Sequence, residues 1–372
     1  MTSVANNFFD VAIIGAGPAG CAGAIFLARS GVRVAIVEQQ RFPRDKVCGE
    51  CVSELGVEVL RRLGAADCLS RVGPAVLERV VIYAADGASM EMELPREMWG
   101  ISRRVMDQLL LEMAREAGAV VFQPVRCEGI GEDIRFHNLE DNSHGAIRAK
   151  YVLLADGKAA LMPGKATATG DFGVKGHFCD VGGKRDAIEL FGLEGHYAGL
   201  APIENGMWNL AMSVPGKMLG RFGGDLDGVF EAVLRASGPL AERLGGARRA
   251  GKWLSSPLPR FGVRRRWPKK VIPLGNAAAA LEPIGGEGMG LAMRSAELAA
   301  EEVRQALSRG REVNMRELRR EFDGLWRVRR MACRAVAMGV SRPKIAKMGV
   351  RAAEGCQSIT KQVYLMMKGS GF

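Results

Sequence analysis

The stretch Asp10-Val-Ala-Ile-Ile-Gly-Ala-Gly-Pro-Ala-Gly20 decides the fold of this chain. Its apolar run predicts a short buried strand, and Gly15, Gly17 and Gly20 follow in the G-x-G-x-x-G spacing of a turn that opens a helix. A second apolar run, residues 32–37, comes after that helix and ends on Glu38. A strand, a glycine turn, a helix and a second strand closed by an acid predict a dinucleotide-binding unit.

Each glycine has its own steric task in such a unit. Gly15 permits the tight turn, Gly17 lets the backbone approach a pyrophosphate, and Gly20 lets helix and strand pack closely. The first turn of the helix offers N–H groups and a partial positive charge to the phosphates, and the acid accepts hydrogen bonds from the adenosine ribose. We therefore expect the nucleotide to bind at Gly15, Gly17, Pro18, Ala19, Gly20 and Glu38.

The composition is that of an ordinary globular protein, with 372 residues of which 48% are hydrophobic and 25% charged. This length favours two packed domains. The N-terminus has neither a basic region nor an apolar leader, and the eight cysteines are scattered, so we expect reduced thiols and a cytoplasmic protein. The histidines and cysteines form no cluster at metal-ligand spacing, which argues against a metal site.

The net charge of +11 is concentrated in two segments. Residues 248–270 hold nine Lys or Arg and no acid, and residues 311–372 hold fourteen Lys or Arg and five acids. The other residues together are therefore acidic, and the basic character describes two local surfaces. The first of these segments is also rich in proline, and we interpret it as a connector.

A second motif, Phe42-Pro-Arg-Asp-Lys-Val-Cys-Gly-Glu50, follows the second strand. It resembles the corresponding loop of the flavoproteins that include geranylgeranyl reductases, flavin-dependent halogenases and related aromatic hydroxylases. In that group the Lys-x-Cys-Gly loop passes close to the isoalloxazine ring. The resemblance implies that FAD is the cofactor and that Lys46, Cys48 and Gly49 line its pocket, with Lys46 and Cys48 as the candidate catalytic residues.

Two later motifs resemble the same group. The segment Ile101-Ser-Arg-Arg-Val-Met-Asp-Gln-Leu-Leu matches a helix of the family, with Ser102 as the expected N-cap, and the match implies that Arg103 reaches the flavin dinucleotide. An apolar run that ends in Ala155-Asp-Gly157 resembles the second fingerprint of the flavoprotein hydroxylases. There the aspartate and the glycine lie near FAD, which implies the same for Asp156 and Gly157.

The third motif of the family is an apolar strand, Gly-Asp, small residues, and then a proline and a glycine-rich helix start. Residues 271–289 resemble it, except that Asn276 replaces the aspartate that accepts a hydrogen bond from the ribityl chain. An amide oxygen still accepts but carries no charge, so we expect somewhat weaker FAD binding. By resemblance the cofactor-binding residues here are Gly275, Asn276, Pro283, Gly286, Gly288 and Met289.

Together the motifs imply an α/β fold, α+β overall, with three parts. A glutathione-reductase-type Rossmann domain binds FAD and is discontinuous, comprising residues 1–77, 100–169 and 271–310. A hydroxylase-like β-sheet domain of residues 78–99 and 170–270 binds the substrate, because alternating apolar residues and glycine turns in 170–214 predict strands. Residues 311–372 form a helical C-terminal segment.

This C-terminal segment has three interpretations. Leu318, Phe322, Leu325 and Val328 recur at helical spacing, which favours a cap over the substrate domain. Trp326, several methionines and many arginines also suit a membrane surface, so peripheral membrane contact is the second interpretation. No nucleic-acid-binding motif accompanies the charge, and we expect no nucleic-acid partner.

The sequence says less about the reaction. His177 falls in an expected strand of the sheet domain and either faces the substrate or is an ordinary strand residue. Cys48 and Cys51 form a C-x-x-C, and the reductases of this group carry a cysteine at the place of Cys48. The Trp-x-Trp-x-Ile-Pro segment of tryptophan halogenases is absent, which leaves phenol-type halogenases open.

The sequence therefore predicts an FAD-dependent oxidoreductase, a monooxygenase or a reductase, that acts on an apolar phenolic, polyketide-like or isoprenoid compound. Hydroxylation through a flavin hydroperoxide and hydride transfer to a carbon–carbon double bond are the two mechanisms. A phenol-type halogenase and a binding protein that kept the FAD fold are the alternatives. Because there is no second G-x-G-x-x-G motif, we expect NAD(P)H to bind transiently, or a partner reductase to supply electrons.

Overall fold

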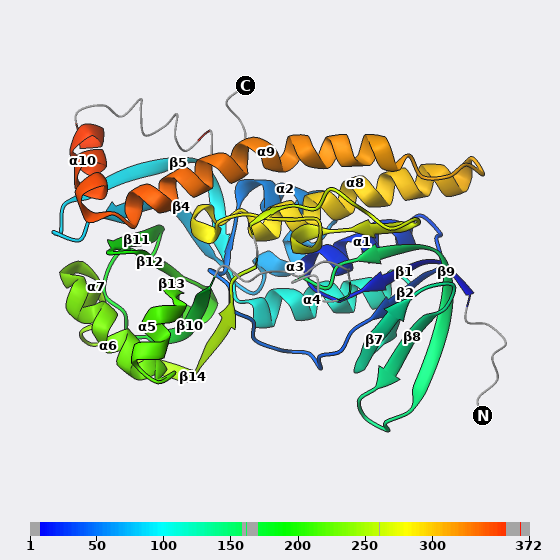
Figure 1. Cartoon of the computed structure of the whole chain (residues 1–372), viewed down its shortest axis with the longest axis horizontal. Coiled ribbons are helices and arrows are strands. Elements are labelled where there is room, and N and C mark those ends of the chain that lie inside the picture. The colour runs from blue at the N-terminus through cyan, green and yellow to red at the C-terminus, as the bar shows by residue number, and fades with distance from the viewer. Residues whose placement is uncertain (1–7, 158–160, 162–169, 260, 355–364, 366–372) are drawn as a thin grey trace.

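The computed structural model describes residues 8–157, 161, 170–259, 261–354 and 365 of the chain. Two large sheets lie side by side, and a long C-terminal helix runs past both of them (Figure 1). The expected mixed α/β architecture, a Rossmann-type part beside a large sheet, is confirmed. None of the helices in these residues is long and apolar enough to cross a membrane.

The first sheet is parallel in its centre and carries the glycine turn. β1 pairs in parallel with β2 on one side and with β9 on the other, so the carboxyl ends of these strands share one edge, where nucleotides bind in such sheets. A hairpin of β7 and β8 extends β9 in the antiparallel sense. The strands are β6 (Val120–Phe122), β2 (Val34–Val37), β1 (Phe8–Ile14), β9 (His144–Leu154), β8 (Ile134–Asn138), β7 (Val125–Ile130) and, beside β9, β16 (Val271–Pro273).

Helices cover this sheet because their apolar faces match its apolar strands. Val11 and Ile13, on one face of β1, form one hydrophobic core with the buried side chains of α1, α4 and α8. α4 begins after Ser102, whose hydroxyl accepts a hydrogen bond from the Val105 amide at 3.2 Å, so the expected N-cap is confirmed. The helices of this part are α1 (Pro18–Arg29), α2 (Glu54–Arg62), α3 (Ala66–Ser70), α4 (Arg103–Glu116) and α8 (Gly288–Ser308).

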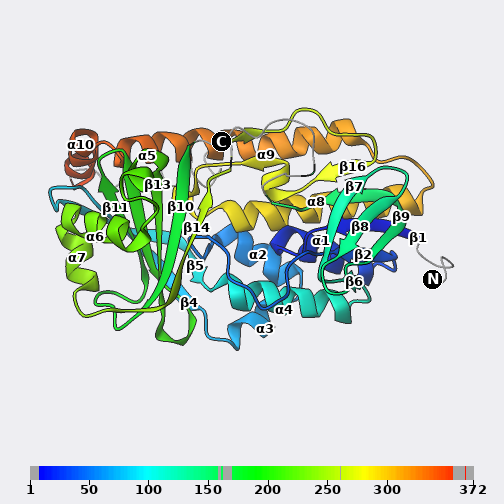
Figure 2. The ribbon, with the colours of Figure 1, turned by 60° about the horizontal axis from the view of Figure 1, so that its bottom comes forward.

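The second sheet has eight strands and is largely antiparallel. One face meets the Rossmann-type part, and α6 and α7 lie on the far side of the sheet (Figure 2). The strands, in spatial order, are β14 (Arg248–Pro257), β10 (Asp171–Cys179), β13 (Trp208–Pro215), β12 (His196–Pro202), β11 (Ala187–Leu193), β4 (Ala75–Tyr83), β5 (Ser89–Gly100) and β3 (Cys51–Val52). The covering helices are α5 (Gly216–Arg221), α6 (Leu226–Ala236) and α7 (Gly238–Leu244).

The expectation that residues 248–270 form a connector is wrong for their first part. Residues 248–257 are the edge strand β14, which pairs with β10 along its length. An edge strand tolerates the charges and the terminal proline that look like a linker in the sequence, because one side of it faces solvent. Arg248 and Arg249 form ion pairs with Asp180 and Asp227 on this surface.

The C-terminal segment forms α9 (Met315–Val340) and α10 (Pro343–Glu354). The inner side chains of α9, which include Phe322 and Trp326, join the core of the Rossmann-type part, while Leu190 and Tyr197 of the second sheet join the same core. A single apolar cluster therefore binds the two sheets and α9 together. Short elements complete the described chain: β15 (Gly262–Val263), β17 (Ala279–Ala280) and 3-10 turns at Glu204–Gly206, Gly275–Ala277 and Pro283–Gly285.

The expected domain limits can be compared with these elements. β4 begins at Ala75 and β5 ends at Gly100, so both strands extend slightly beyond the expected segment 78–99. Residues 1–7, 158–160, 162–169, 260, 355–364 and 366–372 lie outside the described residues, and the domain expectations that fall there stay predictions.

Candidate active site

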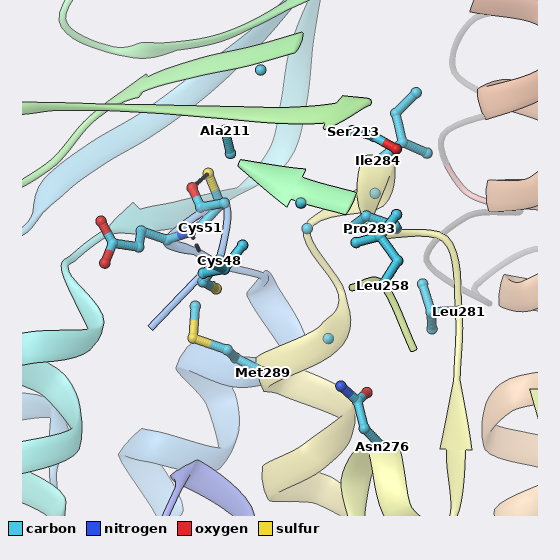
Figure 3. A pocket seen from close by; sticks show the side chains of 18 of the residues that line it. Cys48, Cys51, Ala211, Ser213, Leu258, Asn276, Leu281, Pro283, Ile284 and Met289 are labelled. Carbon is cyan, nitrogen blue, oxygen red and sulfur yellow. Dashed lines mark hydrogen bonds between the residues drawn. The ribbon is translucent and has the colours of Figure 1, made fainter. Parts of the chain in front are cut away.

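A cavity of about 310 Å³ lies where the two sheets and α9 meet. The glycine turn, the loop of residues 46–51 and the start of α8 line one end of it, and strands of the second sheet line the other. Figure 3 shows Cys48, Cys51 and Met289 on one side and Leu281, Pro283 and Ile284 on the other, with Ala211 and Ser213 of β13 above them. The site is therefore built from segments far apart in the sequence.

The glycine turn has the shape that the sequence predicts. Gly15 has a φ of +101°, and a Cβ there would lie 2.6 Å from the Ala155 carbonyl oxygen. A Cβ on Gly20 would overlap the Gly15 carbonyl oxygen, so the turn and the helix can approach only without side chains. These two glycines shape the turn and do not line the cavity.

Gly17 and the first turn of α1 open toward the cavity. A Cβ on Gly17 would have the Arg103 guanidinium, 3.8 Å away, as its nearest neighbour, and no side chain caps α1. The N–H groups of the first helical turn have no partners within the helix and favour a bound anion. Gly17, Pro18 and Ala19 all line the cavity, so this corner fits a pyrophosphate group.

Glu38 lies deeper than expected for a ribose-binding acid. It is buried, and its two carboxylate oxygens accept hydrogen bonds at 2.7 Å from the backbone amides of Ala16 and Gln40. This bonding ties the end of β2 to the glycine turn. A carboxylate oxygen can accept more than one hydrogen bond, so contact with the ribose hydroxyls stays a prediction.

Arg103 belongs to a group of positive charges beside the glycine turn. Its guanidinium binds both carboxylate oxygens of Asp107, at 2.8 and 2.6 Å, and Arg44 lies 3.1 Å from the same carboxylate. Lys46 completes the group: burial, and then the charges of Arg103 and Arg44, lower its pKa to about 8. Three cations around one carboxylate leave excess positive charge, which suits the phosphates of a dinucleotide.

The loop of residues 46–51 is held by a buried ion-pair network that sequence reasoning missed. Glu50 is fully buried, and its carboxylate binds the Lys175 ammonium, the His177 ring nitrogen at 2.6 Å and the Arg103 amide at 2.8 Å. Burial would raise the pKa of Glu50, but His177 and Lys175 outweigh it, and the pKa lies below its ordinary value. Glu50 is the last residue of the motif 42–50, so the sequence marks the carboxylate but does not show which side chains bind it.

His177 does not line the cavity within the described residues, because its ring faces Glu50. Of its two interpretations, the structure supports the strand residue with a structural partner. Lys175, two residues earlier on β10, also donates a hydrogen bond to the Lys46 carbonyl at 3.4 Å. β10 therefore positions both ends of the loop.

Cys48 lies at the tip of this loop and lines the cavity. Its sulfur accepts a hydrogen bond from the Glu50 amide at 3.4 Å, and its carbonyl accepts one from the Asn209 side chain at 3.1 Å. Cys51 also lines the cavity and donates to the Gly49 carbonyl. Both cysteines are reduced, and β13, through Asn209, joins β10 in fixing the loop.

The start of α8 lines the same end of the cavity as the glycine turn. Gly286 has a φ of +64°, and no side chain caps the helix. A Cβ on Gly288 would meet no heavy atom within 4 Å, so the helix N-terminus faces open space. Asn276 points into the same region (Figure 3). This arrangement fits the pyrimidine edge and ribityl chain of a flavin.

In the Ala155-Asp-Gly157 motif, the glycine lines the cavity and the aspartate binds a backbone amide instead. Gly157 lines the cavity, and a Cβ on it would lie 3.2 Å from the Lys46 ammonium. Asp156 does not line it; its carboxylate accepts a hydrogen bond from the Leu161 amide at 3.1 Å. Of the expected site residues, the structure gathers fourteen around the cavity: Gly17, Pro18, Ala19, Lys46, Cys48, Gly49, Arg103, Gly157, Gly275, Asn276, Pro283, Gly286, Gly288 and Met289.

A series of hydrogen-bonded side chains connects α9 to the cavity, and the sequence did not predict it either. The hydroxyl of Tyr197, on β12, donates to Glu282 at 3.1 Å, and Arg334 lies 3.1 Å from the other carboxylate oxygen. Burial raises the pKa of Glu282, although Tyr197 and Arg334 oppose the shift, and burial and then Glu282 raise the pKa of Tyr197. Alternation along β12 predicts two faces but not which one lines the cavity.

No three His, Cys, Asp or Glu side chains of the described residues come together in a way that would hold a metal ion.

Comparison with known proteins identifies the nucleotide-binding part. Residues 9–171 match the family model described as FAD binding domain. Three curated relatives are 25–27% identical to the chain: conditioned medium factor receptor 1 of Dictyostelium discoideum (85% of this chain, 67% of the relative), menaquinone reductase of Mycolicibacterium smegmatis (80% and 76%) and digeranylgeranylglycerophospholipid reductase 2 of Methanopyrus kandleri (80% and 78%).

Solved structures share the whole fold. The flavin-dependent brominase Bmp2 superposes with a TM-score of 0.83 at 19% identity, over 98% of this chain and 94% of that one. A geranylgeranyl bacteriochlorophyll reductase-like protein of Thermoplasma acidophilum gives 0.80 at 17% identity, over 97% and 96%. PqsL of Pseudomonas aeruginosa, a probable FAD-dependent monooxygenase, gives 0.75 at 20% identity, over 93% and 100%.

The FAD binding domain match, the relatives and the shared fold agree with a cavity that fits a flavin dinucleotide. The chain is an FAD-dependent oxidoreductase that is similar in sequence to a menaquinone reductase and a digeranylgeranylglycerophospholipid reductase and in fold to a flavin-dependent brominase.

Proposed function

We propose that the protein reduces a carbon–carbon double bond in an apolar small molecule, such as an isoprenoid chain. The observation that carries this proposal is the Tyr197 hydroxyl, hydrogen-bonded to Glu282, in a cavity wall that is otherwise apolar except for the hydroxyls of Ser213 and Ser256. Such a wall offers few polar groups to a substrate, and Tyr197 is the one with a carboxyl partner to supply a proton. The named activities of two relatives, menaquinone reductase and digeranylgeranylglycerophospholipid reductase, support the same class of reaction.

The size and chemistry of the far end of the cavity suit an apolar substrate. Small residues on neighbouring strands, Gly199, Ala201 and Ala211, leave room between the sheet and the start of α8. Aliphatic and aromatic side chains surround this room, so a substrate gains affinity by leaving water. They are Val80, Ile82, Met92, Met98, Ile188, Leu190, Leu200, Met212, Leu258, Phe261, Leu281, Ile284, Trp326 and Val336.

Reduction of a double bond adds a hydride to one carbon and a proton to the other. Reduced FAD, when bound, supplies the hydride. The Tyr197 hydroxyl holds the proton at the cavity wall, and its raised pKa keeps it protonated at neutral pH. When Glu282 is protonated, its own hydrogen can bond to the Tyr197 oxygen, which frees the phenol hydrogen to point into the cavity. Glu282 then replaces the proton that Tyr197 gives away.

The source of electrons is part of the proposal. The sequence holds no second G-x-G-x-x-G motif, so we propose that NAD(P)H binds transiently or that a partner reductase delivers the electrons. Oxygen-dependent hydroxylation or halogenation of a phenolic compound on the same scaffold is the alternative, since members of this group share a fold and differ in chemistry.

An anaerobic reoxidation experiment tests the proposal. The FAD-loaded protein is reduced with NADPH or dithionite and mixed, without oxygen, with geranylgeraniol. We expect the flavin to be reoxidised and the substrate to gain two hydrogen atoms for each bond reduced, at least one of them deuterium when the reaction is run in heavy water. Reoxidation that requires oxygen and adds an oxygen atom to a phenolic substrate would replace the proposal with the alternative.

A matched pair of tyrosine variants tests the proton donor. Tyr197→Phe should slow anaerobic reoxidation about 100-fold, the lower end of the range for a lost general acid. Tyr83→Phe removes a hydroxyl that binds Arg243 away from the cavity and should leave the rate unchanged. FAD content, measured by absorbance, should stay equal in both variants. Equal rates in both would remove Tyr197 from the reaction.

A further inference from the structure

The outer side of the two C-terminal helices combines apolar and basic side chains. We define the α9–α10 face as Arg327, Met331, Met338, Arg342, Lys344, Ile345, Met348 and Arg351, all exposed. We propose that this face docks the protein on an anionic membrane surface. This inference goes beyond the proposed reaction, because it names where the enzyme works and what holds it there.

The apolar part of the face stands out from the rest of the surface. Eight large hydrophobic side chains are exposed in the described residues, and four of them are Met331, Met338, Ile345 and Met348, exposed by 67, 41, 46 and 71%. The other four are scattered over different elements. The end of α9 and the start of α10 lie close together here: a Cβ built on Gly339 would lie 3.8 Å from the Ile345 side chain. A local group of unbranched and branched apolar side chains suits insertion among lipid headgroups.

The charge of the face supplies the preference for an anionic surface. Residues 324–353 contain eight Lys or Arg and no Asp or Glu, which gives this segment a net charge of +8. Three of the eight are paired: Arg329 with Glu287, Arg334 with Glu282 and Lys347 with Asp86. The other five have no ion-pair partner within the part of the chain that the structure describes. Each basic residue near an anionic bilayer adds about 1 kcal/mol of attraction.

The two sides of α9 face different surroundings. Trp326, which the sequence suggested as a membrane contact, is buried and lines the cavity together with Val336. Arg327, Met331 and Met338 lie on the other side of the same helix. If the proposed reduction of an apolar molecule holds, docking through this face places the cavity one helix diameter, about 10 Å, from the lipid in which such a substrate dissolves.

A lipid surface matches this face better than two other binding partners, a second copy of the chain and nucleic acid. A second copy of the chain would bring like charges together across the interface. Nucleic acid would meet the arginines but leave Met331 and Met348 in contact with a charged backbone, which offers them no apolar surface. An anionic bilayer complements both the cations and the methionines.

Co-sedimentation of the FAD-loaded full chain with vesicles tests the proposal. We expect binding to vesicles of phosphatidylcholine with phosphatidylserine, little binding to phosphatidylcholine alone, and a decrease with added salt. Arg342→Glu with Lys344→Glu should weaken binding to the anionic vesicles at least about tenfold. Met331→Ser with Met348→Ser should weaken it and leave the remaining binding more sensitive to salt.

A matched charge reversal serves as the control. Arg265→Glu with Arg266→Glu changes the net charge equally, at exposed residues of the other basic segment. It should change vesicle binding less than twofold, and FAD absorbance should show that all variants fold. Equal losses in both charge variants, no binding of the wild type at low salt, or self-association without vesicle binding would each overturn the proposal. None of these measurements uses enzyme activity, so failure of the proposed reaction remains a separate result.

Discussion

The two ends of the cavity are built on opposite physical principles. At the cofactor end, the buried charges Glu50, Lys175 and Arg103 each have specific partners that fix the loop of residues 46–51. At the substrate end, the wall is largely apolar and its shape follows from side-chain size; beside the hydroxyls of Ser213 and Ser256, Tyr197 with its partner Glu282 is the polar exception. Loss of one charged partner leaves the other buried charges without a counter-charge. In an apolar wall, by contrast, a single substitution can change the shape of the cavity at a smaller cost in stability. This contrast explains how one FAD scaffold serves different substrates.

The largest effect is expected at the cofactor end, from Glu50→Gln. The change leaves the buried Lys175 ammonium without its counter-charge, which should lower the free energy of unfolding by about 3–5 kcal/mol. The pKa of Glu50 lies below its ordinary value of 4.5, so its stabilising contribution is present above that value. The gap between wild type and variant should therefore narrow as the pH falls through the lowered pKa.

Urea unfolding of the FAD-loaded proteins measures this effect. Glu91→Gln is the matched control, because Glu91 pairs with Lys184 and Arg79 on the exposed part of the same sheet and should cost less than about 1 kcal/mol. Adding Lys175→Met to Glu50→Gln should recover much of the loss, since no uncompensated charge remains. A double variant as unstable as the single one would show that shape, and not charge, holds the loop.

The cofactor end was also the more predictable one. The spacing of Gly15, Gly17 and Gly20 has a steric cause that is local to the sequence, and the turn forms as expected. The motif around Cys48 and the start of α8 likewise reach the cavity. The partners of Glu50 could not be predicted, because Lys175 and His177 lie more than a hundred residues away and only the packing of β10 brings them in.

The second prediction concerns Gly17, where sequence and structure agree most closely. Gly17→Val should weaken FAD binding about 100-fold, or about 2.7 kcal/mol, because the side chain would occupy the place of the pyrophosphate. The fold itself should survive, since a Cβ there meets no atom closer than 3.8 Å. Gly324→Val, at an exposed site on α9, is the control and should retain FAD. Bound flavin is measured by absorbance after gel filtration, and retention in the Gly17 variant would contradict the placement of the cofactor.

The residues that line the substrate end could not be predicted from the sequence, for a physical reason. Alternation along β12 shows that Tyr197, Gly199 and Ala201 share a face, but either face of a sheet covered on both sides can be apolar. The sequence of β14 resembles a linker because an edge strand, with one side open to solvent, tolerates charged residues and proline. Glu282 was part of a recognised segment, yet its partner Arg334 comes from α9, which carries no motif.

The smallest effect is expected from Glu282→Gln, which tests the polar exception in the apolar wall. A glutamine cannot resupply a proton to Tyr197, but the phenol hydrogen remains, so anaerobic reoxidation by an isoprenoid should slow only about tenfold. Burial raises the pKa of Glu282 above its ordinary value of 4.5, against Tyr197 and Arg334 and with help from Asp171. The protonated form grows as the pH falls, so the wild-type rate should rise toward low pH through that pKa.

The variant should lose this rise and keep a flat profile, because glutamine does not titrate. Asp171→Asn is the informative control: it removes a negative charge that raises the pKa of Glu282, so the rise should persist and move to lower pH. Stopped-flow rates over a pH series distinguish the cases. If Glu282→Gln keeps the wild-type profile, another group resupplies the proton to Tyr197, and Glu282 has no part in the reaction.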